Sequence, residues 1–135
     1  MRLEMALAPW RPHLLSLLRL AAGLLLLQHG TAKVLKFPLV QSMAKVSLTT
    51  PAGVAGILEL VGGILLVIGL YTRPTAFILS GMTAVAYFMA HAGRNFYPIL
   101  NGGELAALYC FVFLFLAAAG GGPWSIDAIV RRRGA

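Results

Sequence analysis

Six side chains that can carry a charge lie inside or at the ends of long apolar runs of this sequence. They are Arg19, His29, Lys33, Glu59, His91 and Glu104. A charged group is costly in hydrocarbon, so such residues usually pair with one another and often mark a functional site. Histidines and carboxylates transfer protons, and cationic side chains donate hydrogen bonds to ligand oxygens. These residue types predict a polar cluster that binds or protonates a small molecule.

Helical spacing places the basic members of this cluster on one face. At about 100° per residue, His29 and Lys33 lie about 40° apart, and Arg19 lies within about 40° of Lys33. Opposite charges at similar depths should pair, so we expect Lys33 and Arg19 to face Glu59 and Glu104. The long side chain of Arg19 is expected to reach toward Glu59.

Tyr87 and His91 share a second helical face, because they are separated by one turn. Together these patterns give two groups of candidates. The catalytic candidates are Glu59, His29 and His91, and the ligand-binding candidates are Arg19, Lys33, Glu104 and Tyr87. His13, before the first apolar run, is interpreted as an ordinary interfacial residue.

Four apolar segments must position these residues, at about 14–33, 52–70, 74–91 and 103–119. Each is close to the roughly 20 residues that cross a bilayer as a helix. The 135-residue chain is 59% hydrophobic and only 11% charged, about half the usual charge of a soluble domain. The sequence therefore predicts an all-α, membrane-embedded four-helix bundle that forms one domain over residues 1–135. Arg19 interrupts the first apolar run, so we expect a retained helix there rather than a signal peptide.

The connections and small residues add detail to this bundle. Thr49 or Thr50 followed by Pro51 predicts the start of the second helix, and the apolar and basic loop over 34–51 predicts a short interfacial helix. Gly56 and Gly63 flank Glu59 on one face and favour close helix packing. After the fourth helix, "GGGPW" ends the helix and "SIDAIVRRR" predicts a short interfacial C-terminal helix.

The basic residues predict the orientation of the chain. With four spans both termini lie on one side, and that side carries six basic residues against four on the other. The six are Arg2, Arg11, Arg73, Arg131, Arg132 and Arg133, and the four are Lys33, Lys36, Lys45 and Arg94. The positive-inside rule then predicts a multi-pass inner-membrane protein with cytoplasmic termini. The net charge of +7 indicates contact with anionic lipid; the basic residues form no continuous patch for nucleic acid.

Three kinds of ligand fit the polar residues. A quinone headgroup could accept hydrogen bonds from His, Arg or Lys and exchange protons with Glu or His. Haem ligation by His29 and His91 is disfavoured, because nothing enforces it and charged neighbours are unusual there. A metal site is also disfavoured, because the Glu-x-x-His spacing of di-iron bundles is absent. The single cysteine, Cys110, excludes a dithiol relay within the chain, and buried ion pairs that only hold helices in register remain an alternative.

The motifs resemble those of the DoxX family of small four-helix membrane proteins. The matching stretches are "LLRLAAGLLLLQHGTAK", "GILELVGGILLVIGLYTRPTA", "MAHAG", "NGGELAALY" and "GGGPWSID". The recurrent polar residues of the family fall on Arg19, His29-Gly30, Lys33, Glu59, His91 and Glu104. The family takes its name from a subunit of a thiosulfate:quinone oxidoreductase. The resemblance therefore implies a small membrane subunit of a quinone-linked oxidoreductase that works with other protein subunits or as a homo-oligomer.

Two other classes of function remain open at this stage. A non-catalytic membrane anchor or assembly subunit would use the same charges to hold the bundle together. A proton-coupled or small-solute transporter would also place charge near the midplane of the bilayer. No redox centre is visible in the sequence, so an oxidoreductase role requires a partner protein.

Overall fold

The computed structural model describes residues 2–134 and is 77% helical. Its main helices are α2 (Arg11–Val34), α3 (Pro51–Ile68), α4 (Thr72–Tyr87) and α6 (Glu104–Ala119). A π-helical turn, η3 (Phe88–Ala92), extends α4, and α7 (Ile126–Arg133) follows α6. Shorter elements are α1 (Arg2–Leu7), η1 (Ala8–Trp10), η2 (Gln41–Met43) and α5 (Pro98–Asn101). The predicted all-α bundle with a short C-terminal helix is confirmed.

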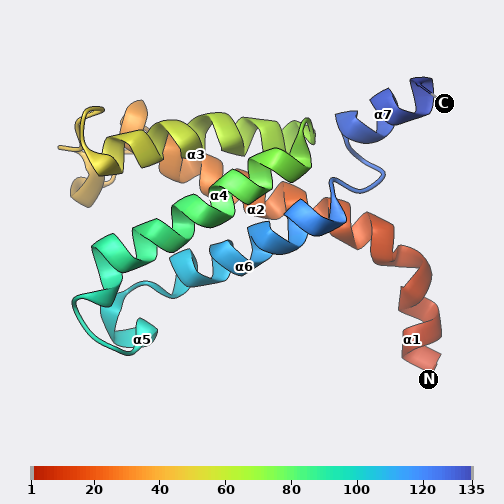
Figure 1. Cartoon of the computed structure of the whole chain (residues 1–135), viewed down its shortest axis with the longest axis horizontal. Coiled ribbons are helices and arrows are strands. Elements are labelled where there is room, and N and C mark those ends of the chain that lie inside the picture. The colour runs from red at the N-terminus through yellow and green to blue at the C-terminus, as the bar shows by residue number, and fades with distance from the viewer. Residues whose placement is uncertain (1, 135) are drawn as a thin grey trace.

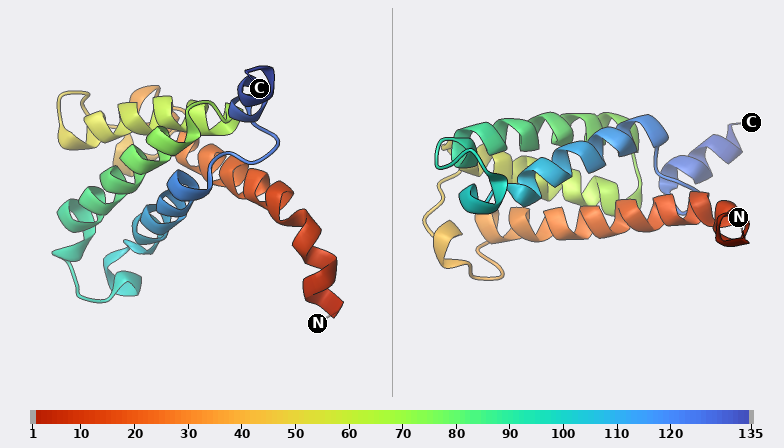
Figure 2. Two further views of the ribbon diagram at one scale, coloured as in Figure 1. Left: turned by 45° about the vertical axis from the view of Figure 1, so that its right-hand side comes forward. Right: turned by 90° about the horizontal axis from the view of Figure 1, so that it is seen from below.

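The bundle consists of two helix pairs arranged as a V. Helix α2 packs along α3 and α4 packs along α6, whereas α3 and α4 share much less contact. The pairs meet near the turn between α3 and α4 and diverge toward α5 (Figure 1). We call the end that carries both chain termini the terminal end, and the end that carries the 35–50 and 93–103 connections the loop end (Figure 2).

The surface of the bundle is that of a membrane protein. Three helical stretches are long and apolar enough to cross a membrane, Arg2–Val34, Pro51–Ile68 and Thr72–Ala92. Helix α6 is apolar but has 16 residues, which gives a length of about 24 Å. A small core centred on Leu26, Leu66, Leu79, Phe113 and Leu116 joins the helices. Most other large apolar side chains, such as Phe111 at 69% exposure, point outward, as expected for contact with lipid.

Glycines bring α2 and α3 into close contact, as predicted. A Cβ atom at Gly30 would lie 2.4 Å from the amide nitrogen of Leu60, and one at Gly63 would lie 2.9 Å from the Cα atom of Leu27. These distances leave no room for a larger side chain. Because lipid provides no hydrophobic force between helices, this close backbone approach supplies the packing that holds the pair together.

Charged side chains cap the helix ends at the terminal end. The guanidinium of Arg19, fully buried, donates to the carbonyls of Leu66 and Val67 at the end of α3, and to those of Gly121 and Trp124. Arg73 donates to the last carbonyls of α6, and both carboxylate oxygens of Asp127 accept amide hydrogens at the start of α4. Helix ends carry unpaired backbone groups, and these side chains satisfy them.

The prediction that Arg19 reaches toward Glu59 is therefore wrong. Its guanidinium bonds to the carbonyls of Leu66 and Val67 and to the turn after α6, and Leu66 lies about 10 Å farther along α3 than Glu59. The free carbonyls at the end of α3 are nearer and accept several hydrogen bonds from one planar guanidinium. Arg19 thus lies outside the loop-end polar cluster.

The loop over residues 35–50 also differs from the prediction. It holds only the single turn η2 rather than an interfacial helix. The ammonium group of Lys36 donates to the carbonyls of Lys33, Met43 and Val46, at 2.8, 3.2 and 2.8 Å. This side chain satisfies backbone groups that a helix would have paired. The predicted start of α3 is confirmed: Thr50 Oγ1 accepts a bond from the amide of Gly53, and Pro51 follows.

Candidate functional site

A large cavity lies between the two helix pairs in the loop-end half of the bundle. Its volume is about 1030 Å³, and its walls come from α2, α3, α4, α6 and the loops that join them. Most of the wall is apolar, with Leu26, Leu58, Ile78 and Met82 among its residues. Ile78 and Leu58 are themselves 56% and 37% exposed on the surface of the chain, so the cavity adjoins the lipid-facing side of the V.

The polar part of the cavity centres on an ion pair between α2 and α3. Lys33 Nζ donates to Glu59 Oε1 at 2.8 Å, and the two side chains are 16% and 9% exposed. Gly56 makes this geometry possible, because a Cβ atom there would lie 2.8 Å from Lys33 Cβ. The predicted pairing of Lys33 with Glu59 is confirmed.

Two buried polar atoms at this pair have no hydrogen-bond partner among residues 2–134. They are Glu59 Oε2 and the phenolic oxygen of Tyr109, and both residues line the cavity. A buried polar group without a partner costs about 1–3 kcal/mol, so such groups are rare in folded proteins. The two atoms offer an acceptor and a donor to whatever fills the cavity.

His29 lies next to this group. It is half-buried, one helical turn before Lys33, and its ring packs edge-on against Tyr109 with 6.5 Å between ring centres. Four groups that exchange or donate protons therefore gather on two adjacent helices and α6: His29, Lys33, Glu59 and Tyr109.

His91 enters the cavity wall from the π-helical turn η3. Its Nδ1 lies 3.1 Å from the carbonyl oxygen of Asn101, and its ring stacks on Tyr87. The buried amide of Asn101 also donates to the hydroxyl of Tyr87 and to the carbonyl of Asn95. Asn101 thus fixes His91 at the wide end of the V, and π-helical turns of this kind frequently occur at functional sites.

The structure brings together four of the seven predicted site residues: His29, Lys33, Glu59 and His91 all line the cavity. Tyr87 does not line it and instead supports His91 from behind. Glu104 is exposed as the first residue of α6 and forms no salt bridge with residues 2–134. Arg19 lies at the terminal end, as described above.

Sequence reasoning missed two residues of the site, Tyr109 and Asn101. Tyr109 carries a hydroxyl in the middle of an apolar helix, and that is the signal that could have revealed it. It shares a helical face with Leu105, whereas Glu104 lies about 140° away from it around the helix. This angle explains why Tyr109 and not Glu104 reaches the cavity. Asn101 sits in a turn-forming loop and gave no signal of its own.

The donor set favours an organic ligand with a polar head. Within residues 2–134, no three His, Cys, Asp or Glu side chains come together as a metal site would require. The cavity instead combines two cations, Lys33 and Arg94, with a carboxylate, a phenol, two imidazoles and an apolar wall that adjoins lipid. Such a site can hydrogen-bond a polar headgroup and exchange protons with it while an apolar tail lies between the helix pairs.

Comparisons with known proteins agree with this architecture. A protein of Haemophilus influenzae described as uncharacterized is 44% identical over 125 residues, which cover 90% of this chain and 93% of the relative. A second protein of the same organism, also described as uncharacterized, is 31% identical over 74 residues, 55% of this chain and 49% of the relative. No solved structure matches the chain significantly. The model of the DoxX family matches residues 14–92, from α2 through η3, and this chain belongs to the DoxX family of membrane proteins.

Proposed function

We propose that the cavity binds the headgroup of a quinone and that the protein is a small membrane subunit of a quinone-linked oxidoreductase. The observation that carries this proposal is the pair of unpartnered buried atoms, Glu59 Oε2 and Tyr109 Oη, in an otherwise apolar cavity. A quinone presents oxygen atoms at its head and an apolar tail. The cavity wall has a matching arrangement, since its polar residues are grouped together and apolar residues surround them.

The residues take distinct roles in this hypothesis. Tyr109, Lys33 and His29 donate hydrogen bonds to the carbonyl oxygens of the oxidised quinone. Glu59 accepts a hydrogen bond from the hydroxyl of the reduced quinone, and it shares protons with His29 as two electrons and two protons enter or leave. The tail lies against Leu58, Ile78 and other apolar residues between α3 and α4.

The electrons come from a partner in this hypothesis, since the sequence shows no redox centre. A membrane or peripheral subunit would oxidise the donor, for which thiosulfate is the candidate that the family resemblance suggests. This chain would then supply the quinone pocket and its proton-exchanging groups. The surplus of arginine at the terminal end supports cytoplasmic termini in the inner membrane. In that orientation the cavity would lie in the outer half of the bilayer.

Quinone binding tests the proposal directly. The protein is purified in detergent, bound quinone is extracted and quantified, and a short-tailed quinone is titrated. Glu59→Gln and Tyr109→Phe should each weaken binding by about 10-fold or more. Tyr109→Phe removes one hydrogen bond to a buried ligand, and Glu59→Gln replaces a charged acceptor with a weaker neutral one. Glu104→Gln is the matched control, since Glu104 is a carboxylate outside the cavity. Unaltered affinity in both cavity variants would refute the site, and a haem spectrum would assign the histidines to another cofactor.

A second candidate function is that of a non-catalytic anchor or assembly subunit. The observation that favours it is the Lys33–Glu59 pair, because a buried ion pair can have the sole role of joining two helices. It predicts that Glu59→Gln lowers the yield of the assembled complex while the turnover of each assembled complex stays unchanged. Counting complexes by quantitative immunoblot, and then measuring turnover per complex, separates the two functions.

A further inference from the structure

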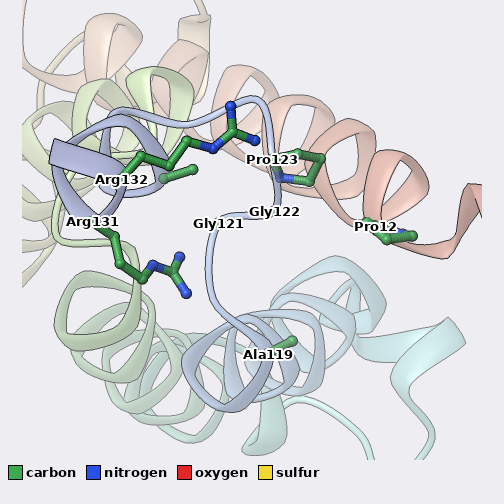
Figure 3. A pocket seen from close by; sticks show the side chains of 8 residues that line it. Pro12, Ala119, Gly121, Gly122, Pro123, Arg131 and Arg132 are labelled. Carbon is green, nitrogen blue, oxygen red and sulfur yellow. The ribbon is translucent and has the colours of Figure 1, made fainter. Parts of the chain in front are cut away.

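A second cavity lies at the terminal end, far from the quinone candidate site. Its volume is about 500 Å³. Figure 3 shows its walls: α7, the turn from Gly121 to Pro123, the end of α6 at Ala119, and Pro12 at the start of α2. The cavity thus lies between the C-terminal helix α7 and the body of the bundle.

The wall of this cavity is cationic. Arg131 and Arg132 both extend from α7 toward the glycine turn (Figure 3), and no acidic residue lines the space. The nearest carboxylate on α7, that of Asp127, is occupied by the amides of Tyr71 and Thr72, at 2.8 and 2.9 Å. Among residues 2–134 neither arginine forms a salt bridge. The cavity therefore offers two guanidinium groups that have no counter-ion within residues 2–134.

Two backbone amides of the turn are also unpaired within residues 2–134. The amide nitrogens of Gly121 and Gly122 have no hydrogen-bond partner in the described part of the chain, whereas the neighbouring amide of Trp124 is bonded to Ser16. Glycine is required at Gly122, where φ is +75° and a Cβ atom would lie 2.3 Å from Ser16 Oγ. The turn is therefore held in one conformation beside the arginines.

Aromatic residues indicate the depth of the cavity in the bilayer. Trp10 and Trp124 are 57% and 50% exposed and lie on either side of the His13 ring, with ring centres 5.7 and 5.1 Å away. Tryptophan concentrates at the boundary between hydrocarbon and headgroups. Both residues are close in sequence to cavity residues, Trp10 to Pro12 and Trp124 to Pro123, so the cavity opens at headgroup depth.

We propose that this cavity binds the phosphate group of an anionic phospholipid. Guanidinium groups bind phosphate through paired hydrogen bonds, and basic pockets between membrane helices are suited to anionic headgroups. A lipid fits better than free phosphate because the rest of the wall is apolar, with Pro12, Ala119, Pro123 and Ala128, and because two exposed tryptophans lie nearby in the sequence. The bound lipid joins α7 to α2 and α6.

Tryptophan quenching by brominated lipid tests this proposal, since both tryptophans of the chain flank the cavity. The protein in detergent micelles is titrated with brominated phosphatidylglycerol and, separately, with brominated phosphatidylcholine. We expect tighter binding of phosphatidylglycerol, and a loss of roughly 10–30-fold in the double variant Arg131→Gln/Arg132→Gln. The control is Arg2→Gln/Arg133→Gln, which removes the same charge from residues outside the wall and should change the affinity less than about twofold.

Three outcomes would overturn the proposal. Equal losses in the two double variants would show general surface attraction. Equal binding of the two lipids, which share the phosphate group, would show that the site does not select a headgroup with a net negative charge. Displacement of the lipid by low concentrations of inorganic phosphate would assign the site to a free anion. If the double variant fails to fold, native mass spectrometry of the unaltered protein tests the proposal. Preferential retention of phosphatidylglycerol over phosphatidylcholine would support the site, and equal retention of the two lipids would refute it.

Discussion

The two ends of this bundle use polar residues in opposite ways. At the terminal end, Arg19, Arg73 and Asp127 each bond to free backbone groups of another segment. At the loop end, Glu59 and Tyr109 each have a buried oxygen atom that finds no partner in the described part of the chain, and both residues line a large cavity. The helix pairs meet at the first end and diverge at the second (Figure 1). At the terminal end, side chains that bond to free backbone groups join the helices, although His13 Nδ1 and Thr72 Oγ1 there also lack a partner among residues 2–134. What distinguishes the loop end is the large cavity that its unpaired groups line.

The largest loss of stability is expected when the hydrogen bonds of Arg19 at the terminal end are removed. Arg19→Met leaves the carbonyls of Leu66, Val67, Gly121 and Trp124 without their donor in a buried region. We expect the free energy of unfolding to fall by about 3–5 kcal/mol, as when one partner of a buried charged network is removed. Denaturant titration of the protein in detergent measures this loss. Arg94→Met, at an exposed position, is the control, and a similar loss in both variants would contradict the assignment of Arg19.

An intermediate effect is expected at the ion pair of the loop end. Lys33→Met leaves the Glu59 carboxylate buried without its counter-charge and should lower stability by about 1–3 kcal/mol. Adding Glu59→Gln to that variant should restore part of the loss, because the two residues act as a coupled pair. The same denaturant titration applied as a double-mutant cycle measures the coupling. Simple additivity of the two changes would show that the pair contributes nothing to the fold.

The smallest effects are expected from removing single hydroxyl groups, one at each end of the bundle. Tyr109→Phe removes a hydroxyl that has no partner, so the stability of the ligand-free protein should stay within about 1 kcal/mol or rise. Ser16→Ala, at the terminal end, removes a hydroxyl bonded to Gly121 and Trp124 and should lower stability by about 1 kcal/mol. Thermal unfolding of the two variants side by side gives the answer. A larger loss for Tyr109→Phe than for Ser16→Ala would reverse the proposed division of roles.

The sequence predicted the helices better than it predicted the cluster of charges. Apolar runs and Pro51 located α3, and the glycines beside Glu59 indicated its packing against α2. Spacing around a helix placed His29 and Lys33 on one face, and both line the cavity. The same spacing placed Arg19 on that face too, yet about 40° of rotation and 14 residues of rise separate it from Lys33. The angular position of a residue around its helix does not show at which depth along the bundle its side chain makes contacts.

The residues that sequence reasoning missed or misplaced share one cause. Glu104 and Tyr109 lie on the same helix, and only the rotation of α6 against α4 decides which of them faces the cavity. Asn101 holds His91 across a loop whose path no local pattern specifies. Contacts between segments far apart in the chain depend on packing geometry, and a single sequence does not contain that geometry in readable form.

By itself, the sequence determined that this chain is a helical membrane protein with paired intramembrane charges, because hydropathy and charge act locally and lipid permits few alternatives. Only the tertiary structure decided how those charges divide. The guanidinium of Arg19 binds carbonyl oxygens at the helix ends, because these lie nearer than any carboxylate of residues 2–134. One carboxylate oxygen of Glu59 lacks a hydrogen-bond partner there, because the diverging helix pairs bring only Lys33 within bonding distance. The divergence itself follows from close glycine packing within the α2–α3 pair and sparse contact between the pairs.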